Sequence, residues 1–389
     1  MATAILNDLE DDQQKALEDY GEGVEREEQV GDDRITNPFD PKLIRVQSLL
    51  MTLDLVVSRI REGAIDLTPD FQRKGGIWKD GAKSRLIESL LIRIPLPAFY
   101  MDASDEDKWL VVDGLQRLTT LHEFILEKNP KKQLKLTELE FLSQELEGKT
   151  WDLLSPLYKR RILETQVTVY KIEPGTPDQV KFNIFKRINT GGLPLSAQEI
   201  RHALNQGPAT RFLQNLADSR TFRGAIDDGV SDDRMARREL VLRFLAFYLT
   251  PYTDYGKKDL DSFLNETMSA LNKAQPIERS ASETVFLQAM ERAQAIFGKL
   301  AFRKIYRRNA RKTPINKALF ETWSVSLAKL TASEAQSLIT HKEQLISGFI
   351  QLMNDPAFEK SVTQGTGDRK QVEKRFSEVE ALIRRTLND

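Results

Sequence analysis

The chain has 389 residues, of which 40% are hydrophobic and 30% are charged, and its formal net charge at pH 7 is −1. This is the composition of a soluble globular protein that is long enough for two or three domains. Because the chain has no cysteine and only three histidines, disulfides and thiol chemistry are excluded, and we expect no histidine-based nuclease or zinc hydrolase. No apolar run is long enough to span a membrane and no signal-peptide pattern is present, so we expect a cytoplasmic protein.

The near-zero net charge hides a segregation along the chain. Residues 1–33 contain twelve Asp or Glu and two Lys or Arg, so they carry about −10 and leave about +9 for the rest. One explanation is a solvated, flexible arm, which we place at residues 1–35. The other is an arm that competes with nucleic acid for the basic remainder of the chain and thereby lowers non-specific binding.

Hydrophobic periodicity up to residue 205 predicts helices that alternate with a few short strands. The expected elements are one or two helices in residues 40–61, a helix at 82–92, paired strands at 98–101 and 109–112, a helix at 116–128, a strand at 166–172 and a helix at 177–188. A variable insert is expected at 129–150. This pattern predicts an α+β domain with a small mixed sheet over residues 36–205.

Beyond residue 205 the apolar spacing is almost wholly helical, and we predict a second, α-helical domain at 206–389. The expected helices are 237–248, 260–271, 281–300, 332–353 and 371–387. No Walker A or G-x-G-x-x-G motif is present, so a doubly wound nucleotide fold is not expected.

The most informative stretch is V-V-D-G-L-Q-R at residues 111–117. An apolar strand runs into Asp113-Gly114, and a helix opens at about Gln116. This arrangement places a carboxylate, an amide and a guanidinium beside the N–H groups of a helix start, which suits phosphate. The alternatives are an ordinary Asp-Gly turn with a surface arginine, or a structural salt bridge between Asp113 and Arg117.

Two further blocks have residues suited to a phosphate or a base. Upstream, L-T-P-D-F-Q-R-K-G-G-I-W (67–78) contains Gln72 and Arg73 before two glycines, and Trp78 can stack on a base or fill the core. Downstream, F-K-R-I-N-T-G-G-L-P-L-S-A-Q-E-I-R (185–201) ends one helix and begins another. Its candidate ligand-binding residues are Lys186, Arg187, Asn189, Thr190 and Gly191, and its Ser196 and Glu199 have the spacing of a capping box.

These three blocks, in this order and spacing, resemble the N-terminal domain family of GmrSD-type, type IV restriction enzymes over roughly residues 45–270. The family has a ParB/sulfiredoxin-like core and a D-G-Q-Q-R motif, whose first Gln is Leu115 here. The resemblance implies a nucleoside triphosphate and Mg²⁺ as cofactors and DNA as a partner in antiviral defence. It assigns catalysis to Asp113, Gln116 and Arg117, with Asp113 also serving the metal, and gives phosphate binding to Arg73, Arg117 and Arg187.

A basic cluster at residues 299–312 is interleaved with aromatic residues. Arg303, Arg307 and Arg311 have the spacing of one helix face, and Arg308 lies beside it. Such a basic stripe is typical of contacts to a nucleic-acid backbone, although solvated basic helix faces are also common.

Three hypotheses follow. The leading one is a Mg²⁺-dependent NTPase that senses DNA, because nothing in the helical, histidine-poor C-terminal half resembles the family's separate nuclease domain. The second is a metal-dependent nuclease in which Asp113 acts with Glu199 or Asp70. The third is a non-enzymatic nucleotide or DNA switch that acts with a partner effector. The sequence leaves the oligomeric state open.

Overall fold

The computed structural model describes residues 23–25, 44–67, 78–188, 195–256 and 259–388. The chain divides into two compact units. The sheet unit comprises residues 39–195, and the helical unit comprises residues 196–389 together with the described residues 23–25. An α+β fold followed by a helical region is confirmed. The limits of independently folding domains stay a prediction.

The sheet unit is built on a five-stranded mixed sheet with the order β1-β5-β3-β4-β2. Its strands are β1 (Val46–Thr52), β2 (Ile65–Asp66), β3 (Phe99–Asp102), β4 (Trp109–Asp113) and β5 (Gln166–Ile172). The pairs β1–β5 and β3–β4 are antiparallel, whereas β3–β5 and β2–β4 are parallel. The predicted strands at 98–101, 109–112 and 166–172 are confirmed as β3, β4 and β5.

The prediction of helix throughout residues 40–61 was wrong in part. Val46–Thr52 is a strand, and the helix α2 (Leu53–Arg61) begins only after Thr52, whose side chain accepts a hydrogen bond from the N–H of Leu55. Val46, Leu49 and Leu50 have spacing that also suits a helix face. The choice is decided by pairing with β5, more than a hundred residues later in the chain, which local periodicity does not reveal.

The inner face of the sheet carries the core of this unit. Its helices are α3 (Asp80–Leu91), α4 (Leu115–Leu121) with a π-helical turn (His122–Leu126), α5 (Ser143–Leu146), a 3₁₀ turn (Trp151–Leu153), α6 (Pro156–Leu163) and α7 (Asp178–Ile188). Apolar residues of α2, α3, α4 and α6 pack with Met101, Val111 and Val169 of the strands. α7 contacts β4 and joins β3 through Lys181, whose Nζ lies 3.4 Å from Oδ2 of Asp102.

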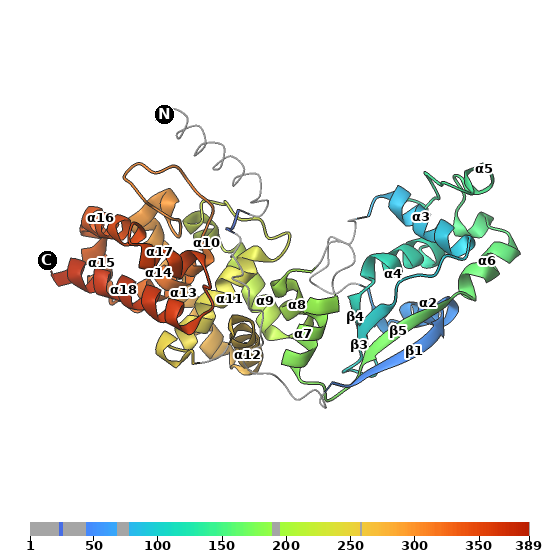
Figure 1. Cartoon of the computed structure of the whole chain (residues 1–389), viewed down its shortest axis with the longest axis horizontal. Helices are drawn as coiled ribbons and strands as arrows, with labels where there is room; N and C mark the ends of the chain where they lie inside the picture. The colour runs from blue at the N-terminus through green and yellow to red at the C-terminus, as the bar shows by residue number, and fades with distance from the viewer. Residues whose placement is uncertain (1–22, 26–43, 68–77, 189–194, 257–258, 389) are drawn as a thin grey trace. The chain divides into compact units, whose positions relative to one another are not determined.

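The helical unit follows from Ser196 (Figure 1). Its described elements are α8 (Ala197–Leu204), α9 (Pro208–Asp218), α10 (Arg220–Ala225), α11 (Ala236–Leu249), a 3₁₀ turn (Tyr252–Asp254), α12 (Leu260–Lys273), α13 (Pro276–Phe297), a 3₁₀ turn (Gly298–Leu300), α14 (Lys317–Ala328), α15 (Ala332–Thr340), α16 (Lys342–Met353), α17 (Pro356–Thr363) and α18 (Arg369–Asn388). The helix predicted at 332–353 is interrupted at His341, where α15 ends. In the described residues, no helix is long and apolar enough to cross a membrane.

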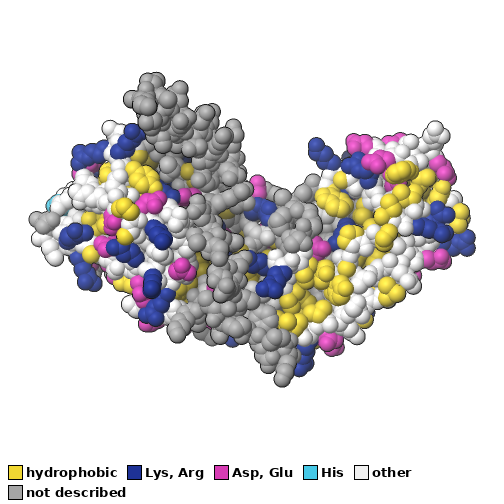
Figure 2. Space-filling model, viewed as in Figure 1, with side chains coloured by type: hydrophobic (Ala, Val, Ile, Leu, Met, Phe, Trp, Pro, Cys, Tyr) yellow, Lys and Arg dark blue, Asp and Glu magenta, His cyan; other side chains and the backbone are white. Residues whose placement is uncertain are grey.

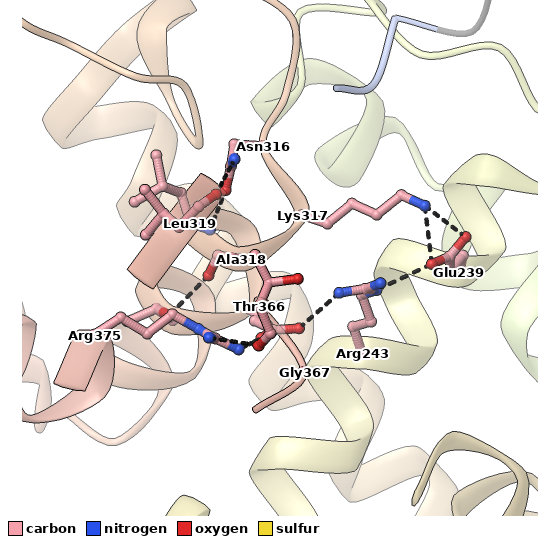
Figure 3. A network of polar contacts seen from close by, with 12 residues as sticks. Glu239, Arg243, Asn316, Lys317, Ala318, Leu319, Thr366, Gly367 and Arg375 are labelled. Carbon is pink, nitrogen blue, oxygen red and sulfur yellow. Dashed lines mark hydrogen bonds and ion pairs between the residues drawn. The ribbon is translucent and has the colours of Figure 1, made fainter. Parts of the chain in front are cut away.

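A network of buried charges joins three helices of the helical unit. Glu321 is fully buried and pairs with Arg243, at 3.3 Å, and with Arg375. Figure 3 shows Arg243 and Lys317 both reaching Glu239, where each nitrogen lies 3.0 Å from a carboxylate oxygen. Burial alone would raise the pKa of Glu239, but Lys317, Arg243 and Arg201 outweigh it and hold this pKa well below its usual range.

A short described piece of the acidic segment is anchored to the helical unit. Val24 is buried and bridges to Ile315, and the N–H of Glu25 donates to the carbonyl of Ile315 at 2.8 Å. The carboxylate of Glu25 accepts hydrogen bonds from Lys304 and Asn316. These contacts fix residues 23–25 beside the basic cluster. The roles proposed for the whole acidic arm remain predictions.

Candidate functional site: the Asp113–Arg117 turn and its surroundings

The turn between β4 and α4 depends on a glycine. Gly114 has φ +97°, and a Cβ atom there would lie 2.4 Å from Cδ1 of Phe99. Both facts favour glycine, because L-residues rarely adopt this backbone conformation and no side chain fits against the ring. Asp113 is therefore the last residue of β4, and α4 begins at Leu115, as the strand–turn–helix pattern predicts.

Arg117 is buried in this turn, with 8% of its surface exposed. Its Nη2 donates to Oδ2 of Asp113 at 2.8 Å and to the carbonyl of Ala98 at 3.2 Å, and its Nη1 donates to the carbonyl of Pro97. The guanidinium carbon lies 4.6 Å from the ring centre of Phe99. These contacts form the structural salt bridge that the sequence left open as an alternative, and they tie α4 to the start of β3.

The environment of this pair shifts its proton equilibria. Burial raises the pKa of Asp113, and this effect outweighs Arg117 and the Gly114 N–H, which both lower it. Burial also lowers the pKa of Arg117, against the opposing effect of Asp113. A carboxylate with a raised pKa is a common feature of functional sites, although structural ion pairs show it too.

Leu115 and Gln116, which lie between Gly114 and Arg117 in the motif, differ in exposure. Leu115 is buried in the core of the sheet unit, with 5% of its surface exposed. Packing therefore explains why an apolar residue stands where the motif has its first Gln. Gln116 is half-buried at the start of α4. Catalytic roles for Asp113, Gln116 and Arg117 stay predictions.

The third block lies on a neighbouring element. Lys186 and Arg187 are exposed in the last turn of α7, the helix that contacts β4. A helix C-terminus favours cations, which provides a structural reason for their position beside the functional one. Asn189, Thr190 and Gly191 lie outside the described residues, as do Gln72 and Arg73 of the upstream block. Trp78, at the end of that block, is half-buried just before α3.

The capping box at the start of α8 is confirmed. The Oγ of Ser196 accepts from the N–H of Glu199 at 3.1 Å, and a Glu199 oxygen accepts from the N–H of Ser196 at 2.6 Å. The same oxygen lies 2.9 Å from Nη2 of Arg234. Glu199 therefore has structural partners. Among the described residues, no group of three or more His, Cys, Asp or Glu is placed to hold a metal ion.

The basic cluster at 299–312 is not a helix, and the predicted stripe was wrong. After the 3₁₀ turn at Gly298–Leu300 the chain is irregular up to α14, with positive φ at Phe302 and Asn309. Arg303 is 2% exposed and donates to the carbonyls of Lys299, Thr313 and Ile226. It therefore holds the loop together and is not available to a nucleic acid.

The neighbouring arginines of Arg303 are exposed, although the segment is not the predicted helix. Arg307, Arg308 and Arg311 are exposed, and Nη2 of Arg308 donates to the Oγ of Ser347 at 2.9 Å. We call these three residues the basic loop. The basic loop lies on an irregular segment, and its contact with nucleic acid stays a prediction.

One arrangement in the sheet unit was not found from the sequence. Tyr100 of β3 and Tyr170 of β5 are in register, and their rings stack with centroids 4.9 Å apart and planes inclined by 19°. Both are half-buried on the sheet face opposite the core. The alternation of polar and aromatic residues with Val167 and Val169 indicated an outward face on this strand. It did not indicate which strand would pair with it.

Comparison with known proteins gives one match. Residues 53–205 match the family model described as GmrSD restriction endonuclease, N-terminal domain. The match runs from α2 through α8 and includes the Asp113–Arg117 turn. No curated protein and no solved structure matches the chain. The ParB/sulfiredoxin-like character of the core stays a prediction, whereas the part of the chain from residue 53 to residue 205 is similar to the N-terminal domain of GmrSD restriction endonucleases.

Proposed function

We propose that this protein is a DNA-sensing component of a prokaryotic restriction system, and that its sheet unit binds and hydrolyses a nucleoside triphosphate. The observation that carries the proposal is the match of residues 53–205 to the N-terminal domain of a restriction endonuclease. DNA is then the macromolecular partner. In this proposal a separate effector nuclease is a second partner.

The exposed cations support this assignment. Lys186 and Arg187 are exposed on α7, a helix that contacts β4, and in this proposal they meet the phosphates of the nucleotide. An arginine can bind a phosphate through two parallel hydrogen bonds, which a lysine cannot copy. The basic loop of the helical unit supplies three more exposed arginines for a nucleic-acid backbone.

Mg²⁺ is the metal that a nucleotide of this kind would bring. Asp113 is the carboxylate of the D-G-L-Q-R motif, and its Oδ2 is already paired with Arg117. In the proposal, Asp113 orients water or the metal, and the phosphates of the nucleotide supply other ligands. Hydrolysis would then proceed through positioning and charge neutralisation, without a covalent intermediate.

The test is phosphate release from ATP, GTP and CTP with Mg²⁺, with and without DNA, by the full chain. We expect release that DNA stimulates and that Arg187→Ala reduces by about tenfold or more, because a phosphate loses its charge-assisted partner. The matched control is Arg160→Ala, which removes an exposed arginine from α6 and should leave the rate unchanged. No release from any nucleotide, with or without DNA, would contradict the hydrolase.

The contacts of the motif favour a second candidate, a nucleotide-binding switch that does not hydrolyse its ligand. Asp113 and Arg117 pair with each other, and Arg117 also satisfies a carbonyl just before β3, which leaves less of the motif for chemistry. For such a switch we expect nucleotide-dependent DNA affinity without phosphate release. The nuclease hypothesis is less favoured, because Glu199 caps α8 and pairs with Arg234.

A further inference from the structure

The sheet face opposite the core presents a row of side chains across three strands. Ser48 of β1 is in register with Tyr170 of β5, and Tyr170 is in register with Tyr100 of β3. Because β5 lies between β1 and β3, the Tyr170 ring has Tyr100 on one side and Ser48 on the other. Paired residues on adjacent strands project from the same face of a sheet at about 5 Å spacing.

The ring of Tyr170 is covered on one side only in this row. Tyr100 stacks on that side, with ring centroids 4.9 Å apart. On the other side stands Ser48, which is exposed and too small to reach the ring face. The spacing between strands is close to the spacing of stacked rings, so the place above Ser48 is a slot for one more planar ring.

The borders of this slot are apolar. Val46 and Leu50 precede and follow Ser48 on the same face of β1, and they are 40% and 67% exposed. Figure 2 shows hydrophobic side chains gathered over the strands of the sheet unit. In the described residues β1 is an edge strand, so a ring can enter from the open side of the sheet.

A cation lies at the start of this edge strand. Arg45 is exposed and precedes Ser48 by three residues, so alternation along an extended chain directs its side chain away from the Ser48 face, and a phosphate would meet it only around the edge of β1. One of its guanidinium nitrogens lies 3.5 Å from the Cβ position of Gly175, in the turn that leads from β5 to α7. The hydroxyl of Ser48 can donate to, or accept from, the polar edge of a base.

We propose that the slot between Tyr170 and Ser48 binds a nucleobase, which stacks on the Tyr170 ring as the third member of the Tyr100–Tyr170 stack. The chemistry is shared by the base of a free nucleoside triphosphate and an unstacked base of single-stranded nucleic acid. This inference rests on the proposed function for its biological setting. The slot lies in the same cross-strand row as Asp113, which is in register with Tyr100, but the base contacts proposed for it use none of Asp113, Arg117, Lys186 and Arg187.

The test is equilibrium binding of two pairs of probes to the full chain. The first pair is ATP and inorganic tripolyphosphate, and the second is a labelled thymine 12-mer and an abasic oligomer of the same length. Tyr170→Ala should weaken binding of the base-containing probe by roughly 5- to 150-fold, the range for loss of one stacked base. The ring-free probe of that pair should bind as before. Whichever pair responds identifies the source of the base.

Matched variants separate stacking from folding. Ser48→Trp fills the slot and should reduce binding as Tyr170→Ala does, whereas Ser48→Ala keeps it open. Tyr170→Phe keeps the ring and should preserve the wild-type affinity. Tyr158→Ala, a tyrosine loss on α6, should change nothing, and thermal melting of each variant confirms that it is folded.

The slot is overturned if the wild type binds neither base-containing probe, or if Tyr170→Ala and Ser48→Trp keep the wild-type affinity for both. Phosphate release separates this failure from failure of the proposed function. Release that continues with unchanged Tyr170→Ala binding disproves the slot alone. Base binding through the slot without any phosphate release disproves the hydrolase alone.

Discussion

Two regions of the molecule each contain a buried arginine. One is the Asp113–Arg117 turn in the sheet unit, and the other is the loop that follows α13 in the helical unit. Arg117 donates to the carbonyls of Pro97 and Ala98, and Arg303 donates to three carbonyls. Each unit also has exposed arginines: Arg187 on α7, the helix that contacts β4, and the basic loop directly after Arg303. Arg117 also donates a hydrogen bond to a carboxylate, whereas the described hydrogen bonds of Arg303 all go to carbonyls and the carboxylate of Asp227 acts on it only electrostatically.

This comparison shows why a basic motif does not by itself locate a phosphate site. A guanidinium has five N–H donors, so it can satisfy backbone carbonyls that a turn or loop leaves without partners. The buried arginine then holds the segment, and its exposed neighbours remain available to a ligand. Each of the following predictions tests this division between buried and exposed arginines.

The largest effect is expected for Arg303→Ala. The carbonyls of Lys299 and Thr313 lose the arginine donor, while that of Ile226 keeps the N–H of Gly229, and an unsatisfied buried acceptor costs about 1–3 kcal/mol. We expect the free energy of unfolding of the helical unit to fall by about 3 kcal/mol or more, as measured by calorimetry and denaturant titration. Arg311→Ala is the control and should lie within about 0.5 kcal/mol of wild type. Equal stability of the two variants would contradict the division.

Arg117→Ala should destabilise the sheet unit by about 2–3 kcal/mol, because it leaves Asp113 and the carbonyl of Ala98 without a strong donor. A double-mutant cycle with Asp113→Asn should give a coupling energy of about 1 kcal/mol or more. If Arg117→Ala has the same free energy of unfolding as wild type, Arg117 is not the structural residue that its contacts indicate.

The basic loop should act on DNA affinity and not on stability. With Arg307, Arg308 and Arg311 all changed to Ala, the slope of log affinity against log salt should fall by up to about 2.7, or 0.9 per lost phosphate contact. Fluorescence anisotropy of a labelled duplex over a range of KCl concentrations measures this slope. An unchanged slope would remove the basic loop from the DNA interface.

The smallest effect concerns pH, where the two units should respond with opposite sign. The depressed pKa of Glu239 gives the helical unit stability that is present above about pH 4.3 and is lost as pH falls below it. The raised pKa of Asp113 gives a contribution that is present below about pH 3.9 and is lost as pH rises through the folded-state value.

Unfolding free energies of wild type, Glu239→Gln and Asp113→Asn between pH 3 and pH 7 test this contrast. The deficit of Glu239→Gln relative to wild type should shrink toward pH 3, whereas the deficit of Asp113→Asn should grow in that direction. Parallel curves for the two variants would show that the two carboxylates do not differ in the way their environments indicate.

Sequence periodicity predicted the parts of the fold that depend on local alternation. β3, β4, β5, α3 and α7 were found in this way, because each has its own apolar face. The strand β1 was missed, since its identity depends on pairing with a strand far along the chain. The helix at Arg303 was wrongly extended past Gly298, because the spacing of the arginines said nothing about the positive φ values at Phe302 and Asn309.

The candidate site shows the same limit. The four-residue spacing of Asp113 and Arg117 made their salt bridge foreseeable, and the capping box of Ser196 and Glu199 was readable for the same reason. The carbonyl partners of Arg117 belong to the segment before β3, which no local pattern connects to α4. The register that places Ser48 beside Tyr170 is likewise a property of the folded sheet.

The most direct test of this account is DNA-stimulated phosphate release per folded molecule for Arg117→Ala and Arg187→Ala, measured beside wild type well below the melting temperature of each. We expect Arg187→Ala to lose about tenfold or more in rate at wild-type stability. Arg117→Ala should lose less of the rate per folded molecule than Arg187→Ala, despite its lower stability. A folded Arg117→Ala protein that releases no phosphate, beside a fully active Arg187→Ala protein, would contradict the division between buried and exposed arginines.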